Sequence, residues 1–157
     1  MAVLKGKKII VVGDRDGVHG EEIVSALKKL GYDVSYSATE CFVCTAAGSM
    51  DFPTQQRIAE LARGKDPSDF AVILGVCDEE GATVHARTVT TGDPSRTGAL
   101  SRVQLRLPVY HIFEQEIKGQ IDRGVYSQTI GLVESSLDEG EVKKTIDVVR
   151  RIREGRD

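Results

Sequence analysis

The chain has 157 residues, about the length of one ordinary domain, and its composition gives no reason to divide it. With 40% hydrophobic and 29% charged residues it has enough apolar material for a core, which excludes an intrinsically disordered chain. The net charge is -3, from 21 basic and 24 acidic side chains, and there is no dense Lys/Arg block. We therefore expect one domain over residues 1–157 and no nucleic-acid partner.

The hydropathy pattern and the cysteine count exclude further classes of protein. The longest apolar runs are far shorter than the ~20 residues that span a bilayer, and the N-terminus lacks the apolar segment of a signal peptide. We therefore expect a cytoplasmic protein with no membrane partner. Three cysteines do not make the dense, even-numbered framework of small secreted domains, so a functional cysteine here would be catalytic, redox-active or metal-bound.

Four segments have the pattern of β-strands. The run KKIIVVG at residues 7–13 is β-branched and ends in glycine, which is typical of a strand buried on both faces. Residues 69–75 (DFAVILG) repeat this pattern, residues 33–37 alternate as DVSYS, and residues 108–113 read PVYHIF.

Helical patterns lie between and after these strands. Apolar residues with helical spacing follow the first strand and are closed by Gly31, and further helices are predicted at residues 54–63, 78–89 and 138–153. The last helix is amphipathic, begins with a capping-box-like Asp138 and Glu141, and should cover one face of the sheet. Alternating strands and helices predict a three-layer α/β/α sandwich with a small parallel sheet, flavodoxin-like or Rossmann-like.

Cys41 and Cys44 form a Cys-x-x-Cys motif after the second predicted strand. In open parallel sheets, reacting groups gather at the carboxyl ends of the strands, so this position is a candidate site. Two thiols at this spacing can form a disulfide that closes a small ring. The small residues 45–48 could begin a helical turn, and the backbone N–H groups of that turn would stabilise the thiolate of one cysteine.

Two other interpretations of the cysteine pair stay open. Both side chains could be buried structural cysteines, or they could bind a metal ion. A zinc site would normally need a second pair of ligands, and the only histidines are the scattered His19, His85 and His111. We expect His85 and His111 to be structural, and Cys77, at the end of the third strand, to be a small core residue.

The GDRDG loop after the first strand contains Asp14, Arg15 and Asp16. Two acidic side chains oppose a phosphate, and the spacing is not that of a dinucleotide-binding loop, so nucleotide binding is disfavoured. These residues could position a substrate or partner near the cysteines, or they could form an Asp-rich turn that caps the following helix. Both interpretations stay open.

The segment TVTTGDP at residues 88–94 combines hydroxyl groups with a turn. Thr91 and Asp93 could line the same site. The alternative is a helix that ends in a Gly-Asp-Pro turn, with no functional role.

Four motifs together resemble one known family. They are GDRDG at residues 13–17, TECFVCTAAGSMD at 39–51, TVTTGDP at 88–94 and PVYHIFEQEIK at 108–118. With VYSQTIG at residues 125–131, the resemblance covers nearly the whole chain and is to the selenoprotein A component of the glycine, sarcosine and betaine reductase complexes. The string around the cysteines is the specific part, since the other pieces would be weak alone.

This resemblance implies a redox-active carrier in amino-acid fermentation, with no cofactor. A substrate-specific protein B would supply a carboxymethyl group derived from glycine, sarcosine or betaine to the nucleophile at residue 44, cleaving the C–N bond. Protein C would receive the two-carbon unit, which is later released as acetyl phosphate. The carrier would be left oxidised across Cys41 and Cys44, and thioredoxin would reduce it.

The family carries selenocysteine where this sequence has Cys44, and a thiol is a poorer nucleophile and leaving group than a selenol. Weaker catalysis is therefore implied with sulfur at this position. The same motifs imply positioning of substrate or partner by a set of surrounding side chains: Asp14, Arg15, Asp16, Glu40, Thr45, Thr91 and Asp93.

Two alternative functions remain. A general thiol–disulfide oxidoreductase would also use the cysteine pair, although the tryptophan expected before the first cysteine is absent because the chain contains none. A flavodoxin-like or receiver-like binding module would use Asp14 and Asp16 with a metal ion or a flavin, although the aromatic content of 5% offers little to stack on a flavin ring.

Overall fold

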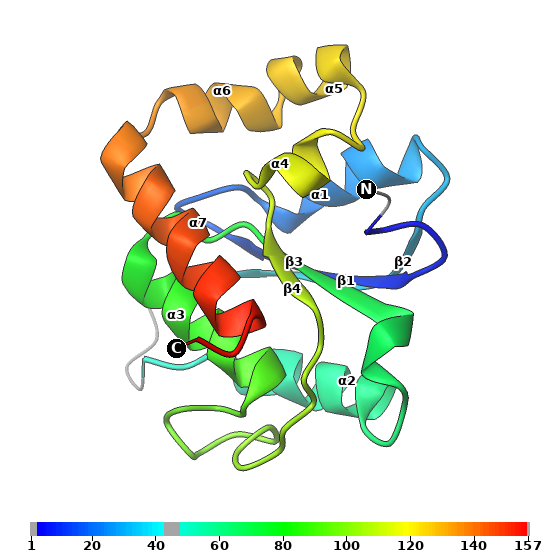
Figure 1. Cartoon of the computed structure of the whole chain (residues 1–157), viewed down its shortest axis with the longest axis vertical. Helices are drawn as coiled ribbons and strands as arrows, with labels where there is room; N and C mark the ends of the chain where they lie inside the picture. The colour runs from blue at the N-terminus through cyan, green and yellow to red at the C-terminus, as the bar shows by residue number, and fades with distance from the viewer. Residues whose placement is uncertain (1–2, 43–47, 157) are drawn as a thin grey trace.

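A computed structural model describes residues 3–42 and 48–156. Its centre is a sheet of four parallel strands in the order β2-β1-β3-β4 (Figure 1). The strands are β1 (Lys8–Asp14), β2 (Asp33–Glu40), β3 (Phe70–Leu74) and β4 (Val109–His111). The predicted parallel sheet and α/β sandwich are thus confirmed.

The helices, in chain order, are α1 (Gly20–Lys28), α2 (Phe52–Ala62), the 3₁₀ helix η2 (Pro67–Asp69), α3 (Glu79–Thr90), α4 (Gln115–Lys118), α5 (Arg123–Gln128), α6 (Ile130–Ser135) and α7 (Glu139–Arg153). The four long helices were predicted from their spacing. The short helices α4, α5 and α6 were not, because four to six residues are too few for an apolar periodicity to show. None of the helices in the described part of the chain has the length and apolar character needed to cross a bilayer.

Two strands end two or more residues away from where they were predicted to end. The second was expected to end at Ser37, but β2 continues to Glu40 because its last three residues stay in register with the end of β1. The fourth was expected to reach Phe113, but β4 ends at His111. There the backbone N–H of His111 donates to the side chain of Glu114, 2.9 Å away, and the chain turns.

Helices cover both faces of the sheet, as Figure 1 shows. On one face the core joins Ile9, Val11 and Ile73 to α1, α4 and α6. On the other face Ile10 and Val12, with their neighbours on β3, pack against α2, α3 and α7. Because alternate residues of each central strand are buried on opposite faces, the strands are apolar without interruption, which made them easy to predict.

Helix α7 covers the edge of the sheet next to β4, and does not cover one face alone as predicted. Its first half contributes Val142 to one core, and its second half contributes Val148, Val149 and Ile152 to the other. The helix packs against α3 and β4. It therefore protects an edge strand whose unpaired backbone groups could otherwise pair with another chain.

A buried ion pair fastens this helix to the end of β4. The two terminal nitrogens of Arg153 donate to the two carboxylate oxygens of Glu114, each at 2.8 Å, and Nη1 also donates to the carbonyl oxygen of Val109 at 2.8 Å. The guanidinium lies 4.3 Å from the ring centroid of Tyr110. The Glu114 side chain is completely buried, so its charge depends on this arginine.

Replacing Arg153 with methionine should lower the free energy of unfolding by about 3 kcal/mol, because it leaves the buried Glu114 carboxylate without its bidentate partner. Urea unfolding followed by circular dichroism measures this loss. The matched control is Arg156→Met, which removes an exposed ion pair with Glu154 and should leave the urea midpoint unchanged. Equal midpoints for the two variants would contradict the role given to Arg153.

Candidate functional site

The carboxyl edge of the sheet brings two acidic residues and one cysteine together. Strand β1 ends at Asp14 and β2 ends at Glu40, and these two residues are paired in the register of the sheet. Cys41 follows Glu40 directly. The strand order reverses direction between β1 and β3, so the edge beside Asp14 is the switch point where open α/β sheets bind and react.

Cys41 is partly exposed and disulfide-bonded, whereas Cys77 is a free thiol. Two of the predicted site residues, Cys44 and Thr45, lie outside the described residues. The predicted helical turn at residues 45–48 falls largely there too. Gly48 belongs to a bend, and α2 begins only at Phe52.

Glu40 links the two ends of the segment that carries the cysteines. Its side chain is buried, Oε1 accepts from the backbone N–H of Asp51 at 2.6 Å, and Oε2 accepts from the hydroxyl of Thr54 at 2.8 Å. Both donors belong to the start of α2, so a strand-end carboxylate supplies acceptors that the N-terminus of this helix needs. The segment from Cys41 to Met50 is thereby closed at its base.

The pKa of Glu40 is raised to about 7, mainly by burial and in part by the nearby Asp51, although the two hydrogen bonds oppose this shift. The carboxyl group therefore changes charge near neutral pH while it holds the base of the segment.

Gln55 connects the cysteine segment to the TVTTGDP motif. This buried side chain donates from Nε2 to the carbonyl oxygen of Met50 at 2.9 Å and accepts at Oε1 from the backbone N–H of Leu100 at 3.1 Å. It lies in the first turn of α2, next to Thr54. No motif in the sequence indicated this role, because a single glutamine has no pattern and one of its two partners, Leu100, lies 45 residues away.

Asp93 organises the loop that Gln55 holds. Its carboxylate accepts from the backbone N–H groups of Ser95, Thr97 and Gly98 and from the Ser95 hydroxyl, at 2.7–3.1 Å. Burial alone would raise the pKa of Asp93, but these four hydrogen bonds lower it. Thr91 is the exposed C-cap residue of α3. The geometry here fits the turn interpretation of this motif, and its link to the cysteine segment is indirect.

The three polar side chains of the GDRDG loop lie in different environments. Asp14 is buried and accepts at Oδ1 from the backbone N–H of Asp16 at 2.9 Å, while the side chains of Arg15 and Asp16 are exposed. Burial raises the pKa of Asp14, although the backbone N–H groups of Asp16 and Phe42 lower it. The backbone N–H of Arg15 donates to the carbonyl oxygen of Glu40 at 2.7 Å, which joins the loop to the end of β2.

The helix-capping interpretation of this loop is wrong. The N-cap residue of α1 is His19, and its side chain makes no capping hydrogen bond. The glycines are needed for close backbone packing: a Cβ on Gly13 would lie 2.1 Å from the backbone nitrogen of Gly20, and one on Gly17 would lie 2.4 Å from the carbonyl oxygen of Gly75. Both glycines are therefore required by the packing of the backbone.

A buried histidine that the sequence marked as structural lies next to the cysteine segment. The ring of His85, on α3, meets the ring of Phe42 edge-on, with the centroids 5.8 Å apart. Neither ring nitrogen has a hydrogen-bond partner among the described residues, and burial lowers the pKa to about 4. His111 differs, since it bonds the carbonyl oxygen of Val76 and accepts from the N–H of Phe113.

Cys77 shows the properties expected of a structural residue. It packs against the core beneath α1, and burial raises the pKa of its thiol to about 12, so it is a thiol and not a thiolate at neutral pH. In the described part of the chain, no group of three or more histidine, cysteine or acidic side chains is arranged to hold a metal ion.

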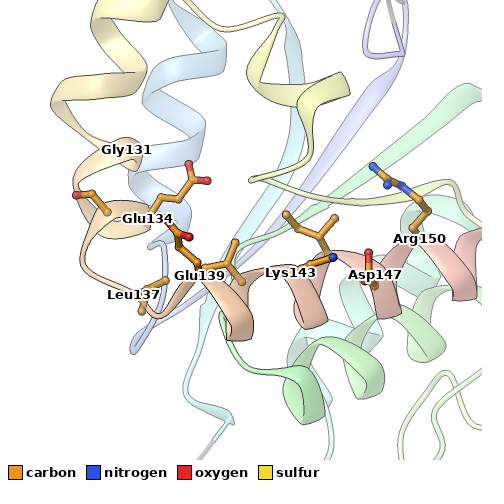
Figure 2. Close-up of a pocket in the computed structure, with 10 residues that line it drawn as sticks. Gly131, Glu134, Leu137, Glu139, Lys143, Asp147 and Arg150 are labelled. Carbon is orange, nitrogen blue, oxygen red and sulfur yellow. The ribbon is translucent and has the colours of Figure 1, made fainter.

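A hollow of about 740 Å³ lies between α6 and α7 (Figure 2). Its lining combines the apolar Leu137, Val142 and Ile146 with charged side chains of α7, and holds no cysteine or histidine. Arg150, at one end, is already close to Glu114 and Glu116. The described residues that line this hollow include no thiol, so it offers no group for the redox chemistry of a cysteine pair.

The pKa of Glu40 leads to a stability prediction. Between its ordinary value of 4.5 and about 7, the folded chain holds a proton that the unfolded chain releases, so stability should fall as pH rises through this range. The loss should be on the order of 2–3 kcal/mol. Glu40→Gln keeps an acceptor for Asp51 and cannot ionise, so the fall should be reduced by this amount. Urea unfolding between pH 4 and 8 measures it.

The control for this experiment is Glu60→Gln, the same change at an exposed position on α2. Glu60→Gln should retain the pH dependence of the parent. A Glu40→Gln variant with an undiminished fall in stability would show that Glu40 ionises in the folded state as it does in the unfolded chain.

Comparison with known proteins identifies the family. The family described as "Glycine reductase complex selenoprotein A" matches residues 4–153. Component A of the glycine/sarcosine/betaine reductase complex from Symbiobacterium thermophilum is 46% identical over 151 residues, 96% of each chain. The corresponding protein of Gottschalkia purinilytica is 41% identical over 148 residues, 94% of this chain and 99% of that protein.

Component A1 from Peptoclostridium acidaminophilum is 44% identical over 154 residues, which cover 98% of this chain and 96% of that protein. No solved structure matches the chain. The match at the family level and the near-complete coverage of these relatives lead to the same result: the chain belongs to the family of the glycine reductase complex selenoprotein A.

Proposed function

We propose that this chain acts as component A of a glycine/sarcosine/betaine reductase complex. In this role residue 44 receives a carboxymethyl group, derived from glycine, sarcosine or betaine, from a protein B and presents it to a protein C. Thioredoxin then reduces the oxidised chain. The proposal rests on the family membership and on one observation, the disulfide-bonded and partly exposed Cys41 at the switch-point edge of the sheet.

The chemistry requires two groups with different tasks. A nucleophile at residue 44 attacks the α-carbon of the activated substrate and displaces its nitrogen, so that the carboxymethyl group becomes bound to the carrier. Cys41 then forms a bond to residue 44 as the two-carbon unit leaves, and the resulting disulfide, or selenenyl sulfide in the selenium form, is reduced by a dithiol. A disulfide at Cys41 is what this cycle expects of its oxidised stage.

The surroundings of Cys41 support its part in this redox cycle. Glu40 fixes the base of the cysteine segment to α2, so Cys41 begins from a rigid strand end. Exposed side chains around it, those of Arg15, Asp16 and the half-exposed Phe52, could contact proteins B and C or thioredoxin in turn. Thr45, Thr91 and Asp93 belong to the proposed positioning set as well, with Asp93 acting through the loop held by Gln55.

A general thiol–disulfide oxidoreductase is the competing function, and it would use the same cysteine pair. It predicts reduction of an unrelated protein disulfide such as that of insulin, with no need for proteins B and C. A component A should be slow in that assay, because its oxidised form is recognised as a substrate by thioredoxin.

The test of the proposal separates the two cysteines. With radiolabelled substrate and protein B, Cys41→Ser should accept the label in a single turnover but fail to complete thioredoxin-linked cycles. Cys44→Ser should accept none, because a serine hydroxyl is scarcely ionised near neutral pH and cannot displace the nitrogen. Mass spectrometry locates the label, and selenocysteine at residue 44 should transfer faster than cysteine.

Cys77→Ser serves as the control, since a buried thiol with a raised pKa should take no part. Label that accumulates on Cys41 in the Cys44→Ser variant would overturn this division of tasks. Rapid insulin reduction without transfer of label would instead favour the general oxidoreductase.

A further inference from the structure

The loop that joins α3 to β4 holds three arginines in a strained backbone conformation. This α3–β4 loop runs from residue 91 to residue 108, and connections longer than about 15 residues without secondary structure are uncommon unless they have a function. Every non-glycine residue with a positive φ in the described ranges lies in it: Arg96, Arg102 and Arg106, at 59°, 60° and 53°. Arginine rarely adopts this conformation, because its Cβ crowds the following carbonyl oxygen.

Two of these three arginines line one hollow of about 430 Å³. Its lining comes from three separate segments, which contribute Arg87 on α3, Arg96 after the turn at Asp93, and Arg102 with Gln104 further along the loop. Three positively charged side chains therefore border one hollow in a chain whose net charge is -3. Like charges that are held close together repel each other, so an anion bound between them is favoured.

Two of these positive charges have no anionic partner in the described part of the chain. Arg96 and Arg102 are exposed, and the side chain of neither makes an ion pair or a hydrogen bond with a described residue. The acidic residue among the described lining residues is Asp93, which is buried and whose two carboxylate oxygens already accept from backbone N–H groups of the loop. By contrast, Arg153 and Arg156 both have acidic partners.

The α3–β4 loop is attached firmly to the rest of the fold. The buried Gln55 accepts from the backbone N–H of Leu100 at 3.1 Å, and the backbone N–H of Leu107 donates to the carbonyl oxygen of Val89 at 3.0 Å. Strained residues persist only where the surrounding structure determines their conformation, and they cluster at functional positions. A loop that is already ordered also loses less conformational freedom when a ligand binds.

The chemistry of the lining selects the class of ligand. Guanidinium groups bind the oxygens of phosphates and carboxylates through paired N–H donors. Arginines on three segments suit a tetrahedral group, whose oxygens point in several directions, better than a planar carboxylate. The described lining residues include no aromatic or large aliphatic side chain, which a nucleotide base or the centre of a protein interface would need.

We propose that this hollow binds a phosphate group, either as free inorganic phosphate or as part of a small acyl phosphate. Arg96 and Arg102 donate to the phosphate oxygens, and Arg87 contributes further positive charge. No phosphate binds to this chain in the proposed function, so the site is a separate property. Its presence or absence is measured without proteins B and C, and neither result bears on transfer of the carboxymethyl group.

The experiment titrates the full chain with inorganic phosphate and follows the NMR shifts of its backbone amides. The salt concentration is about 0.15 M, at which exposed charges more than about 8 Å apart are largely screened. Saturable shifts should appear in the α3–β4 loop and at the end of α3. Acetyl phosphate and sodium acetate are titrated in parallel. Equal affinity for the two phosphates assigns the site to the phosphate group alone, and tighter binding of acetyl phosphate assigns it to an acyl phosphate.

Glycine substitutions separate binding from stability, because glycine adopts a positive φ without strain. Arg96→Gly and Arg102→Gly should each weaken phosphate binding about tenfold, a typical effect of losing a hydrogen bond to a charged group. Neither change should lower the midpoint of urea unfolding. The matched control is Arg106→Gly, the same substitution at the same backbone conformation outside the lining of the hollow, which should keep the parent affinity.

Four results would overturn the proposal. The first is the absence of saturable shifts up to about 10 mM phosphate, well above a millimolar dissociation constant. The second is acetate binding as tightly as phosphate, since a planar carboxylate would then suffice. The third is parent affinity in both Arg96→Gly and Arg102→Gly. The fourth is an equal loss in Arg106→Gly, which would indicate unspecific attraction to a basic loop.

Discussion

The buried Glu40 carboxylate is the constraint on which the candidate site depends. It ends a strand at the place where the chain must leave the sheet, and its two oxygens are bonded by groups at the start of α2. Since those donors lie 11 and 14 residues further along the chain, one side chain fixes both ends of the cysteine segment. Gln55, next in α2, extends the same support to the loop that Asp93 organises.

Acidic residues recur where strands end, and their carboxyl groups differ in the partners that they have. Glu40 has helix N-terminal donors, Glu114 has the guanidinium of Arg153, and Asp14 has one satisfied and one unsatisfied oxygen. The first two arrangements hold secondary structure together. In the third, one oxygen of the Asp14 carboxyl group has no hydrogen-bond partner among the described residues. A buried carboxyl group with such an oxygen is a candidate for chemistry, whereas one with both oxygens bonded is structural.

The sequence predicted those features that depend on local pattern. The apolar strands and the long helices show because burial on a face imposes a period, and Cys41 was found because its spacing to Cys44 has chemical meaning. The roles of Glu40, Gln55 and Glu114 were out of reach, since their partners are distant in the chain and a single carboxylate or amide carries no period. No pattern in the sequence explained the two glycines of the GDRDG loop, whereas the structure shows that Gly13 and Gly17 are required by backbone packing.

The ion pair between Glu114 and Arg153 also bears on how the chain is made. Ribosomal synthesis is vectorial, so β4 and Glu114 emerge before α7, and until that helix arrives a strand edge is uncovered and an acidic group lacks its cation. The sheet can form in this interval, but its open side remains able to pair with other chains. Native assembly is therefore complete only after the last predicted helix has docked, which makes this region the point at which a nascent chain would most benefit from a chaperone.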